Sequence, residues 1–162
     1  MKATKEKIYV DSNTPMEQQI AFLRQSSITF QFNTFEVLKE KLGSEGIEIF
    51  KTILRKDYSQ VIEKAKGKSF EEIKKVAGIT ERVFGFQTEQ DYTKPDEFQY
   101  SITYCPTLEE CKRRGIGVDF CTIGEDVHIE ELSKSLGEIT EPTRMCWGDN
   151  KCTIKLKNTF GR

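Results

Sequence analysis

The spacing of apolar residues changes near Pro95, and this change constrains the fold more than any other feature of the sequence. Over residues 15–84, apolar side chains recur every three or four positions, which is typical of amphipathic helices. Over residues 98–104 they alternate with polar neighbours, as in a half-buried strand. Residues 139–157 read as two strands around a turn at residues 148–150. The sequence therefore predicts an α+β fold in which N-terminal helices pack on an antiparallel sheet with a C-terminal β-hairpin.

The helical region divides into three segments. The first ends at Gly43 and carries two apolar rows on different sides, so we expect a central helix that is covered on two faces. The rows comprise Ile20, Leu23, Ser27, Phe30, Thr34 and Val37 on one side, and Ile28, Phe32, Phe35 and Leu42 on the other. A second helix is predicted over residues 45–66. A third opens at Ser69 and ends at either Gly78 or Phe84.

The composition fits one globular domain of ordinary size. We predict a single domain over residues 1–162, with a helical half at 14–85, a cysteine-bearing α+β half at 96–158, and a short strand at 8–10. A net charge of −1 argues against a nucleic-acid partner, which would require a basic surface. No stretch approaches the ~20 apolar residues of a membrane span, and the first ten residues lack the apolar core of a secretory signal. We therefore expect a cytoplasmic protein without a nucleic-acid or membrane partner.

The segment between the central strand and the hairpin has a predicted local structure of its own. Thr107 is the expected cap of a short helix, which returns Cys111 to the strand end that carries Cys105. Residues 119–121 are expected in a loop or a short strand. A last helix is predicted over residues 126–136, because a glycine follows its final apolar residue.

All five cysteines of the chain lie between residues 105 and 152, and none lies earlier. Thiols stay reduced in the cytoplasm, so clustered cysteines there are more often metal ligands or catalytic groups than disulfides. The candidate metal ligands are Cys105, Cys111, Cys121, Cys146 and Cys152. Zinc or an iron–sulfur cluster is the cofactor that such thiolates would hold. The alternative is that several of them are small core hydrophobes, since free cysteines are often buried and the C-x2-C spacing of structural zinc sites is missing.

The hairpin turn gives a geometric prediction for the last two cysteines. If its loop is residues 148–150, Cys146 faces Cys152 across the strands, with Cβ atoms roughly 4.5–5.5 Å apart. Two thiols at that separation suit a shared metal or a cross-strand disulfide. A shifted register would separate them.

A few other side chains are candidates for acid–base chemistry. Glu125, Asp126 and Asp149 lie near the cysteines in sequence and could carry protons or bind a metal. Helix capping by Asp126 and a turn role for Asp149 are the structural alternatives. His128, the single histidine, could pair with a cysteine nucleophile or lie on the surface.

This half of the chain resembles the L-2-amino-thiazoline-4-carboxylic acid hydrolase-like family. The resemblance follows a strand ending in Cys-Pro, a later Phe-Cys, and a closing Cys-Trp-Gly-Asp-Asn-Lys-Cys, and the matching residues are Cys105, Cys121, Gly148, Asp149 and Cys152. It implies hydrolysis of a cyclic amidine C–N bond in a small-molecule substrate. Under it the three matching cysteines carry the chemistry, and Asp126 or Asp149 handles the proton. Cys111 and Cys146 are additions to the family pattern.

The ending is also similar to that of 4-vinyl reductase type domains, a ligand-binding class in which two cysteines bracket a glycine. Cys146, Gly148 and Cys152 match it. That resemblance implies a small-ligand-binding or sensor domain with a cysteine-bound zinc or iron–sulfur centre. A carboxylate placed beside the thiols favours the enzyme, and a closed four-thiolate site favours the sensor. Self-association into a homo-oligomer stays open in both cases.

Overall fold

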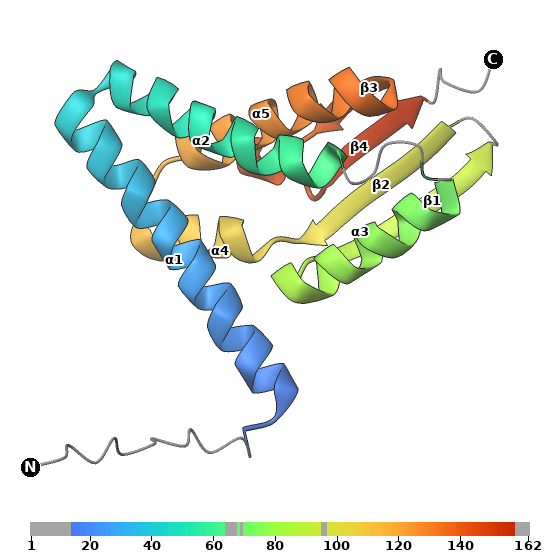
Figure 1. Ribbon diagram of the computed structural model, residues 1–162, viewed down its shortest axis with the longest axis horizontal. Coiled ribbons are helices and arrows are strands. Elements are labelled where there is room, and N and C mark those ends of the chain that lie inside the picture. Colours follow the sequence, from blue (N-terminus) through green and yellow to red (C-terminus); the bar gives the residue numbers. More distant parts are fainter. Residues whose placement is uncertain (1–13, 64–67, 69, 95–96, 158–162) are drawn as a thin grey trace, which may run out of the picture.

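The computed structural model describes residues 14–63, 68, 70–94 and 97–157, and Figure 1 shows its elements. In chain order these are α1 (Met16–Leu42), α2 (Ser44–Glu63), α3 (Phe70–Phe84), β1 (Gln87–Lys94), β2 (Glu97–Tyr104), α4 (Pro106–Arg114), α5 (Asp119–Leu136), β3 (Glu138–Thr143), the 3-10 turn η1 (Met145–Trp147) and β4 (Cys152–Lys157). The predicted α+β class with a C-terminal hairpin is confirmed. The strand expected at residues 8–10 lies outside the described residues.

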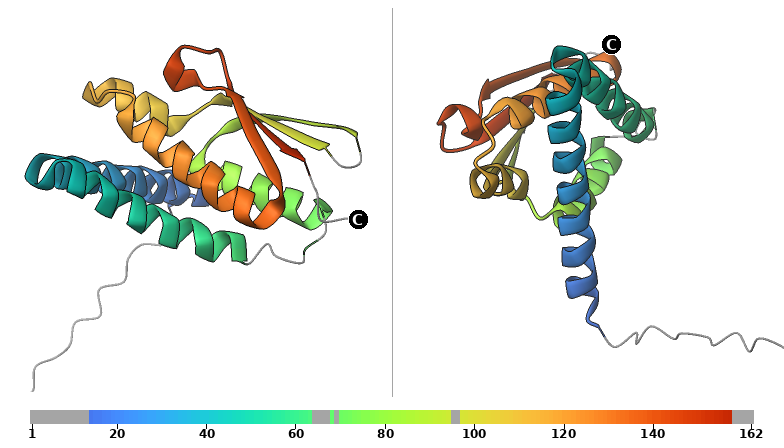
Figure 2. Two further views of the ribbon diagram at one scale, coloured as in Figure 1. Left: turned by 90° about the horizontal axis from the view of Figure 1, so that it is seen from above. Right: turned by 90° about the vertical axis from the view of Figure 1, so that its left-hand side faces the viewer.

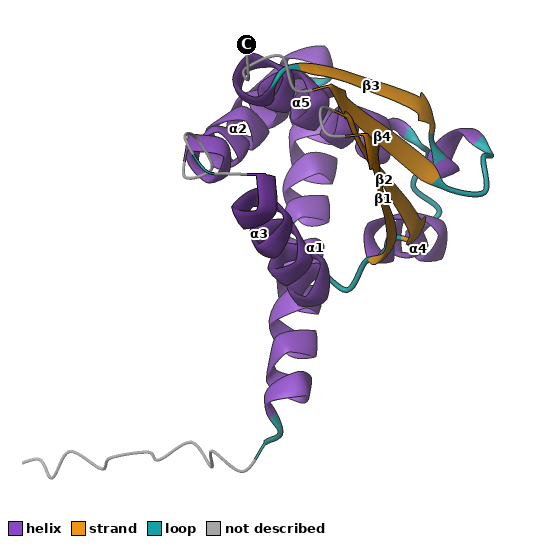
Figure 3. Ribbon diagram, turned by 90° about the vertical axis from the view of Figure 1, so that its right-hand side faces the viewer, coloured by secondary structure: helices purple, strands orange, loops and turns teal. Residues whose placement is uncertain are grey.

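The four strands form an antiparallel sheet in the order β1-β2-β4-β3. β4 pairs with β2 on one side and with β3 on the other, so the C-terminal strand is central. Figure 3 shows the strands gathered on one side of the molecule, with α1, α2, α3 and α5 on the other. In the left view of Figure 2, α5 lies along the sheet, to which its C-terminal end is joined through β3.

The main core lies where α1, α2 and α5 pack together. Its buried members are Ile28, Phe32, Phe35, Phe50, Leu54, Cys111, Phe120 and Val127. Phe32 stacks on Phe120 with ring centroids 3.9 Å apart, and Phe35 meets Phe120 edge-on at 5.3 Å. Burial of each such ring contributes roughly 1.5–3 kcal/mol, so these rings fix how α5 sits against the helical half.

Only one of the two apolar rows of α1 is covered. In the row that contains Ile28, the side chains of Ile28, Phe32 and Phe35 are buried. In the other row, Leu23, Phe30 and Val37 are exposed. The expectation of a helix covered on two faces is therefore wrong for the described chain. Figure 1 shows that the N-terminal part of α1 also extends beyond the helices that pack on its other half.

A close approach between α1 and α2 depends on glycine. Gly43 separates the two helices and adopts a φ of 58°, a conformation that favours glycine. A Cβ atom added to Gly46 would lie 2.0 Å from the carbonyl oxygen of Leu38. The absence of a side chain at Gly46 thus allows the first turn of α2 to contact the backbone of α1.

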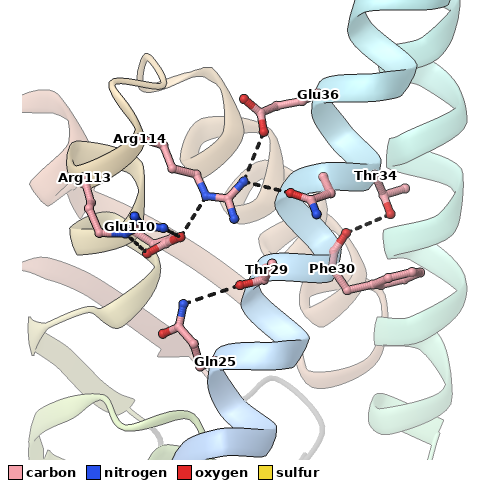
Figure 4. Close-up of polar contacts among 9 residues, drawn as sticks. Gln25, Thr29, Phe30, Thr34, Glu36, Glu110, Arg113 and Arg114 are labelled. Atoms are coloured by element: carbon pink, nitrogen blue, oxygen red, sulfur yellow. Dashed lines mark hydrogen bonds and ion pairs between the residues drawn. The ribbon is translucent and has the colours of Figure 1, made fainter.

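The short helix α4 is tied to α1 by one arginine, as Figure 4 shows. Arg114 donates to Asn33 Oδ1 at 2.9 Å and to Glu36 Oε2 at 3.1 Å on α1. It also donates to Glu110 Oε1 at 2.7 Å on its own helix. Hydrogen bonds from Arg113 and Arg114 lower the pKa of Glu110 to about 2. This charged network holds α4 in place, and with it the cysteine at its beginning.

The structure differs from the sequence-based prediction at β1 and at the start of α5. Residues 87–94 form an edge strand that the prediction lacks, since β1 is polar along its length and carries no alternating apolar pattern. Helix α5 begins at Asp119, so the loop or short strand predicted for residues 119–121 is wrong. No side chain caps this helix start, and burial of Phe120 in the main core favours the helical conformation there.

Candidate functional site

Three of the predicted thiols come together in a small cluster next to the sheet. Cys121 and Cys146 are buried in it with Leu108, and Cys105 and Met145 pack against them. Cys105 precedes α4, Cys121 lies in the first turn of α5, and Cys146 lies in η1. All five cysteines are free thiols. We call the group of Cys105, Cys121 and Cys146 the thiol cluster.

Cys105 is the capping residue of α4. Its Sγ accepts a hydrogen bond from the backbone N–H of Leu108 at 3.4 Å, so the predicted cap at Thr107 is wrong. Burial raises the pKa of the Cys105 thiol, whereas hydrogen bonds from Leu108 and Thr107 act to lower it. A helix N-terminus stabilises a negative charge, which is one way in which proteins activate cysteines. Cys105 is also only half-buried, while the other four cysteines are buried.

Cys121 and Cys146 contact each other inside the cluster. Burial raises the pKa of Cys121, and the neighbouring Cys146 raises it further by charge and by hydrogen bonding. Buried thiols with raised pKa values stay protonated near neutral pH and are poor nucleophiles. Cys105 differs from both in being only half-buried and in lying at the N-terminus of α4, and these two features favour it as the reactive member of the cluster.

The remaining two cysteines are placed differently. Cys111 belongs to the main helical core, where burial raises its pKa to about 11. Cys152 lies on β4 opposite Ile102 of β2, and burial raises its pKa to about 12. Its Sγ accepts a hydrogen bond from the N–H of Met145 at 3.3 Å.

The predicted opposition of Cys146 and Cys152 is wrong. β3 ends at Thr143, which pairs with Thr153, and Cys146 lies in η1 rather than in a strand. The loop is longer than predicted because its turn is built around the backbone of Arg144. The Arg144 N–H donates to Asp149 at 2.9 Å, and the N–H of Asp149 donates back to the carbonyl oxygen of Arg144.

The two aspartates of the sequence-based hypothesis both interact with Arg144. Asp126 is exposed and pairs with Arg144 Nη1 at 2.7 Å. Asp149 accepts the Arg144 N–H within the η1 loop. These contacts hold the loop that carries Cys146, so the roles given by the structure are positional. The proton-handling role of Asp126 or Asp149 stays a prediction.

Glu125 is the carboxylate that α5 turns toward the thiols. Cys121, Glu125 and His128 follow one another at spacings of four and three residues, which places them on one face of the helix. The charge of Glu125 raises the pKa values of Cys105, Cys121 and Cys152. Glu125 Oε2 lies 3.8 Å from His128 Nδ1. The sequence signal that could have identified Glu125 is its four-residue spacing from Cys121. This spacing places the two residues on one face only if the helix begins before Cys121, as α5 does.

Further titratable groups surround Glu125. The ring of Tyr58 on α2 stacks on His128 with centroids 4.8 Å apart, and burial and the charge of Glu125 raise its pKa. The pKa of Tyr100 on β2 is raised by burial, by the charge of Glu81 and by a hydrogen bond with Glu81. The charge of Glu125 makes a smaller contribution in the same direction. Burial and the charge of Glu125 raise the pKa of Glu141 on β3 to about 7. The charge of Glu125 thus contributes to the raised pKa values of groups on both the helices and the sheet.

The cysteines do not form a ready metal site. Within the part of the chain that the structure describes, no group of three or more His, Cys, Asp or Glu side chains is arranged to hold a metal ion.

Comparisons with models of protein families, with curated proteins and with solved structures gave no match to this chain. Among the described helices, none is both long and apolar enough to span a bilayer. Functional inference therefore depends on the arrangement of the thiols and carboxylates.

Proposed function

We propose that this protein is a small hydrolase that opens a cyclic amidine C–N bond, with Cys105 as the nucleophile and Glu125 as the residue that carries the proton. One observation supports this above all others: a half-buried thiol begins α4, and the charge of Glu125, a partly buried carboxylate on α5, acts on that thiol. The resemblance to the L-2-amino-thiazoline-4-carboxylic acid hydrolase-like family supports the reaction class. A carboxylate beside the thiols is also the feature that favours an enzyme over a sensor domain.

The proposed reaction begins with transfer of the Cys105 proton to Glu125. Burial disfavours the free thiolate, so a neighbouring base is required. The sulfur then attacks the amidine carbon while the N–H groups at the start of α4 stabilise its charge. The ring C–N bond breaks as Glu125 returns the proton to the leaving nitrogen, which leaves the carbon bound to sulfur. A water molecule attacks that carbon as Glu125 accepts one of its protons. The bond between the carbon and the Cys105 sulfur then breaks, and Glu125 returns the proton to the sulfur so that the thiol is restored.

The test uses L-2-amino-thiazoline-4-carboxylic acid as the substrate and mass spectrometry as the detector. We expect a product heavier by one water molecule, a rate that is lost in Cys105→Ser, and a rate that is retained in Cys111→Ser. Cys111 is the matched control because it is a buried thiol of the helical core. No product from the unaltered protein, or equal rates in both variants, would contradict the proposal.

A second candidate is a small-ligand-binding or sensor domain of the 4-vinyl reductase type, with zinc or an iron–sulfur centre on cysteines. The match of Cys146, Gly148 and Cys152 to the ending of that domain class supports it. Because no three of the described side chains are arranged to hold a metal, binding would require Cys105, Cys121 and Cys146 to move closer together. Metal content and the visible spectrum of protein purified without oxygen test it. Bound metal that is lost in Cys121→Ser but kept in Cys111→Ser would support the sensor.

We further propose that two copies of the chain associate through α1. Met16, Leu23, Phe30 and Val37 are exposed and follow one another at intervals of seven residues, which is the repeat of helices that pair side by side. Sedimentation velocity should show a dimer that Phe30→Glu converts to a monomer. Ile79→Glu, on the exposed surface of α3, is the control and should leave the dimer intact. A monomer in the unaltered protein would rule the association out.

The proposed compartment is the cytoplasm, because five free thiols persist most readily in a reducing environment. The proposed partner is a small molecule rather than a nucleic acid, in keeping with the net charge of −1.

A further inference from the structure

Three thiols that lie far apart in the sequence share one packed cluster. Cys121 and Cys146 are buried in it together with Leu108, and Cys105 packs against them. Met145 adds a thioether sulfur to the same cluster. All the cysteines are free thiols. Oxidation can join two thiols that pack together, so the thiol cluster is able to give up and take back a pair of electrons.

Cys105 is the member of the thiol cluster that a small oxidant in the solvent reaches first. It is half-buried, whereas Cys121 and Cys146 are buried. Its Sγ accepts the N–H of Leu108 at 3.4 Å at the beginning of α4. The N–H groups of a helix start stabilise the negative charge that a thiolate carries when it attacks an oxidant. Exposure and local charge therefore both favour Cys105 as the thiol that is oxidised first.

Cys146 is the cluster thiol with the greatest freedom to approach Cys105. Cys121 is fixed in the first turn of α5, because its neighbour Phe120 is buried among the rings of the main core. Cys146 lies instead in the three-residue turn η1, and residues 147–150 are exposed. A disulfide requires Cβ atoms about 4 Å apart. A shift of the η1 turn within the cluster supplies the final approach.

We infer that the thiol cluster reduces hydroperoxides, with Cys105 as the thiol that takes the oxygen and Cys146 as the thiol that completes a disulfide with it. In the first step the Cys105 sulfur attacks one oxygen of the hydroperoxide and the O–O bond breaks. An alcohol leaves, or water in the case of hydrogen peroxide, and Cys105 becomes a sulfenic acid.

In the second step the Cys146 sulfur attacks the sulfur of the sulfenic acid. The S–O bond breaks, and the hydroxyl group leaves as water with the proton of Cys146. The two thiols have then lost two electrons to the hydroperoxide. A dithiol such as dithiothreitol returns the electrons by thiol–disulfide exchange and restores both thiols.

The reaction is tested on the full chain, which is reduced, freed of reductant and treated with hydrogen peroxide. Burial raises the pKa of the Cys105 thiol, so a mildly alkaline buffer is used to increase the thiolate fraction. Trypsin cuts after Lys112, Arg144 and Lys151, so Cys105 and Cys146 fall on different peptides. Mass spectrometry should find these two peptides joined, in a chain that is lighter by two hydrogen atoms.

Four variants assign the roles of the thiols. Cys105→Ser should abolish the cross-link. Cys146→Ser should also abolish it but should leave a sulfenic acid on Cys105, which dimedone traps. Cys111→Ser and Cys121→Ser are the matched controls, because each removes a buried thiol that the reaction does not use, and both should keep the cross-link. Circular dichroism verifies that each variant is folded.

Trp147 provides a second readout that needs no digestion, because it is the single tryptophan and directly follows Cys146. Its fluorescence should change as the disulfide forms and should recover with dithiothreitol. The mass of the unaltered protein staying constant after peroxide treatment would overturn the inference. A cross-link from Cys105 to any other cysteine, or one that persists in Cys105→Ser, would overturn it as well.

The peroxide reaction goes beyond the proposed hydrolase and does not depend on it, since its readouts are taken without the thiazoline substrate. Absence of turnover by the reduced protein would reject the hydrolase and leave the peroxide reaction standing. An unreactive thiol cluster in a protein that opens the thiazoline ring would reject the peroxide reaction alone. Where both hold, oxidation should stop turnover and dithiothreitol should restore it, because both reactions use Cys105.

Discussion

The ring of Phe120 stacks on the ring of Phe32, with centroids 3.9 Å apart and planes inclined by 19°. The next residue along the chain, Cys121, lies in the thiol cluster. One turn of α5 therefore contributes to both the helical core and the candidate site. Packing of Phe120 sets the position of Cys121, so the stability of the core and the geometry of the thiols are coupled.

Replacement of Phe120 by alanine should lower the free energy of unfolding by about 3–5 kcal/mol, because it removes a ring buried among three others. Urea denaturation followed by circular dichroism measures the loss. Phe22→Ala is the control, since Phe22 is 72% exposed on α1, and it should change stability by no more than about 0.5 kcal/mol. Equal losses in the two variants would contradict the packing described for α5.

Replacement of Glu125 by glutamine should reduce turnover of the thiazoline substrate by about 10²-fold or more, since a positioned proton carrier contributes that much. Asp126→Asn and Asp149→Asn test the alternative derived from the sequence. Both side chains interact with Arg144, so each change should mainly cost stability, by about 1 kcal/mol. A steep loss of turnover in Asp149→Asn with normal activity in Glu125→Gln would return the proton-handling role to Asp149.

The stability of the protein should fall as the pH rises from 4.5 to about 7, through Glu141. Burial and the charge of Glu125 raise the pKa of Glu141 from 4.5 to about 7. Between these values the folded protein holds a proton that the unfolded chain has released, so each rise in pH favours unfolding, by about 3 kcal/mol over the whole interval. Glu141→Gln removes this contribution, and urea unfolding at several pH values should then give a flatter profile. Parallel profiles of stability against pH for the unaltered protein and Glu141→Gln would contradict a raised pKa of Glu141.

Replacement of Gly46 by alanine should destabilise the protein by more than about 2 kcal/mol, because the added methyl group overlaps the backbone of α1 at Leu38. Gly78→Ala is the matched control within α3. Nothing lies within 4 Å of a methyl group added at Gly78, so this change should stabilise the helix by about 0.5–1 kcal/mol. Thermal unfolding distinguishes the two, and a stabilising effect of Gly46→Ala would contradict the close approach of α1 and α2.

The fold class was predictable because the period of the apolar pattern reports directly on helix and strand. Strand β1 was not predictable, because its sequence is polar and lacks an alternating apolar pattern. It forms through backbone pairing with β2. The start of α5 was missed for a related reason. Val118 provides no side-chain cap, and the helix there is favoured by burial of Phe120 against residues far away in the sequence.

The candidate site was predictable only in its thiols. Clustering in sequence identified the cysteines, and the structure brings Cys105, Cys121 and Cys146 together. Glu125 became distinguishable from Asp126 only once α5 was known to include Cys121, because neighbouring helix positions face different directions. Glu141 reaches the same region from β3, and local sequence patterns give no indication of such a contact.

The order of the strands leaves β1 and β3 at the two edges of the sheet. β3 contains Pro142, which has no N–H to offer, and its register shifts between Thr140 and Thr143. β1 is polar along its length and its register shifts twice against β2. Edges of this kind resist the addition of a further strand. The sheet is therefore protected against amyloid-like stacking, and crowding of the protein should promote contacts between helices before contacts between strands.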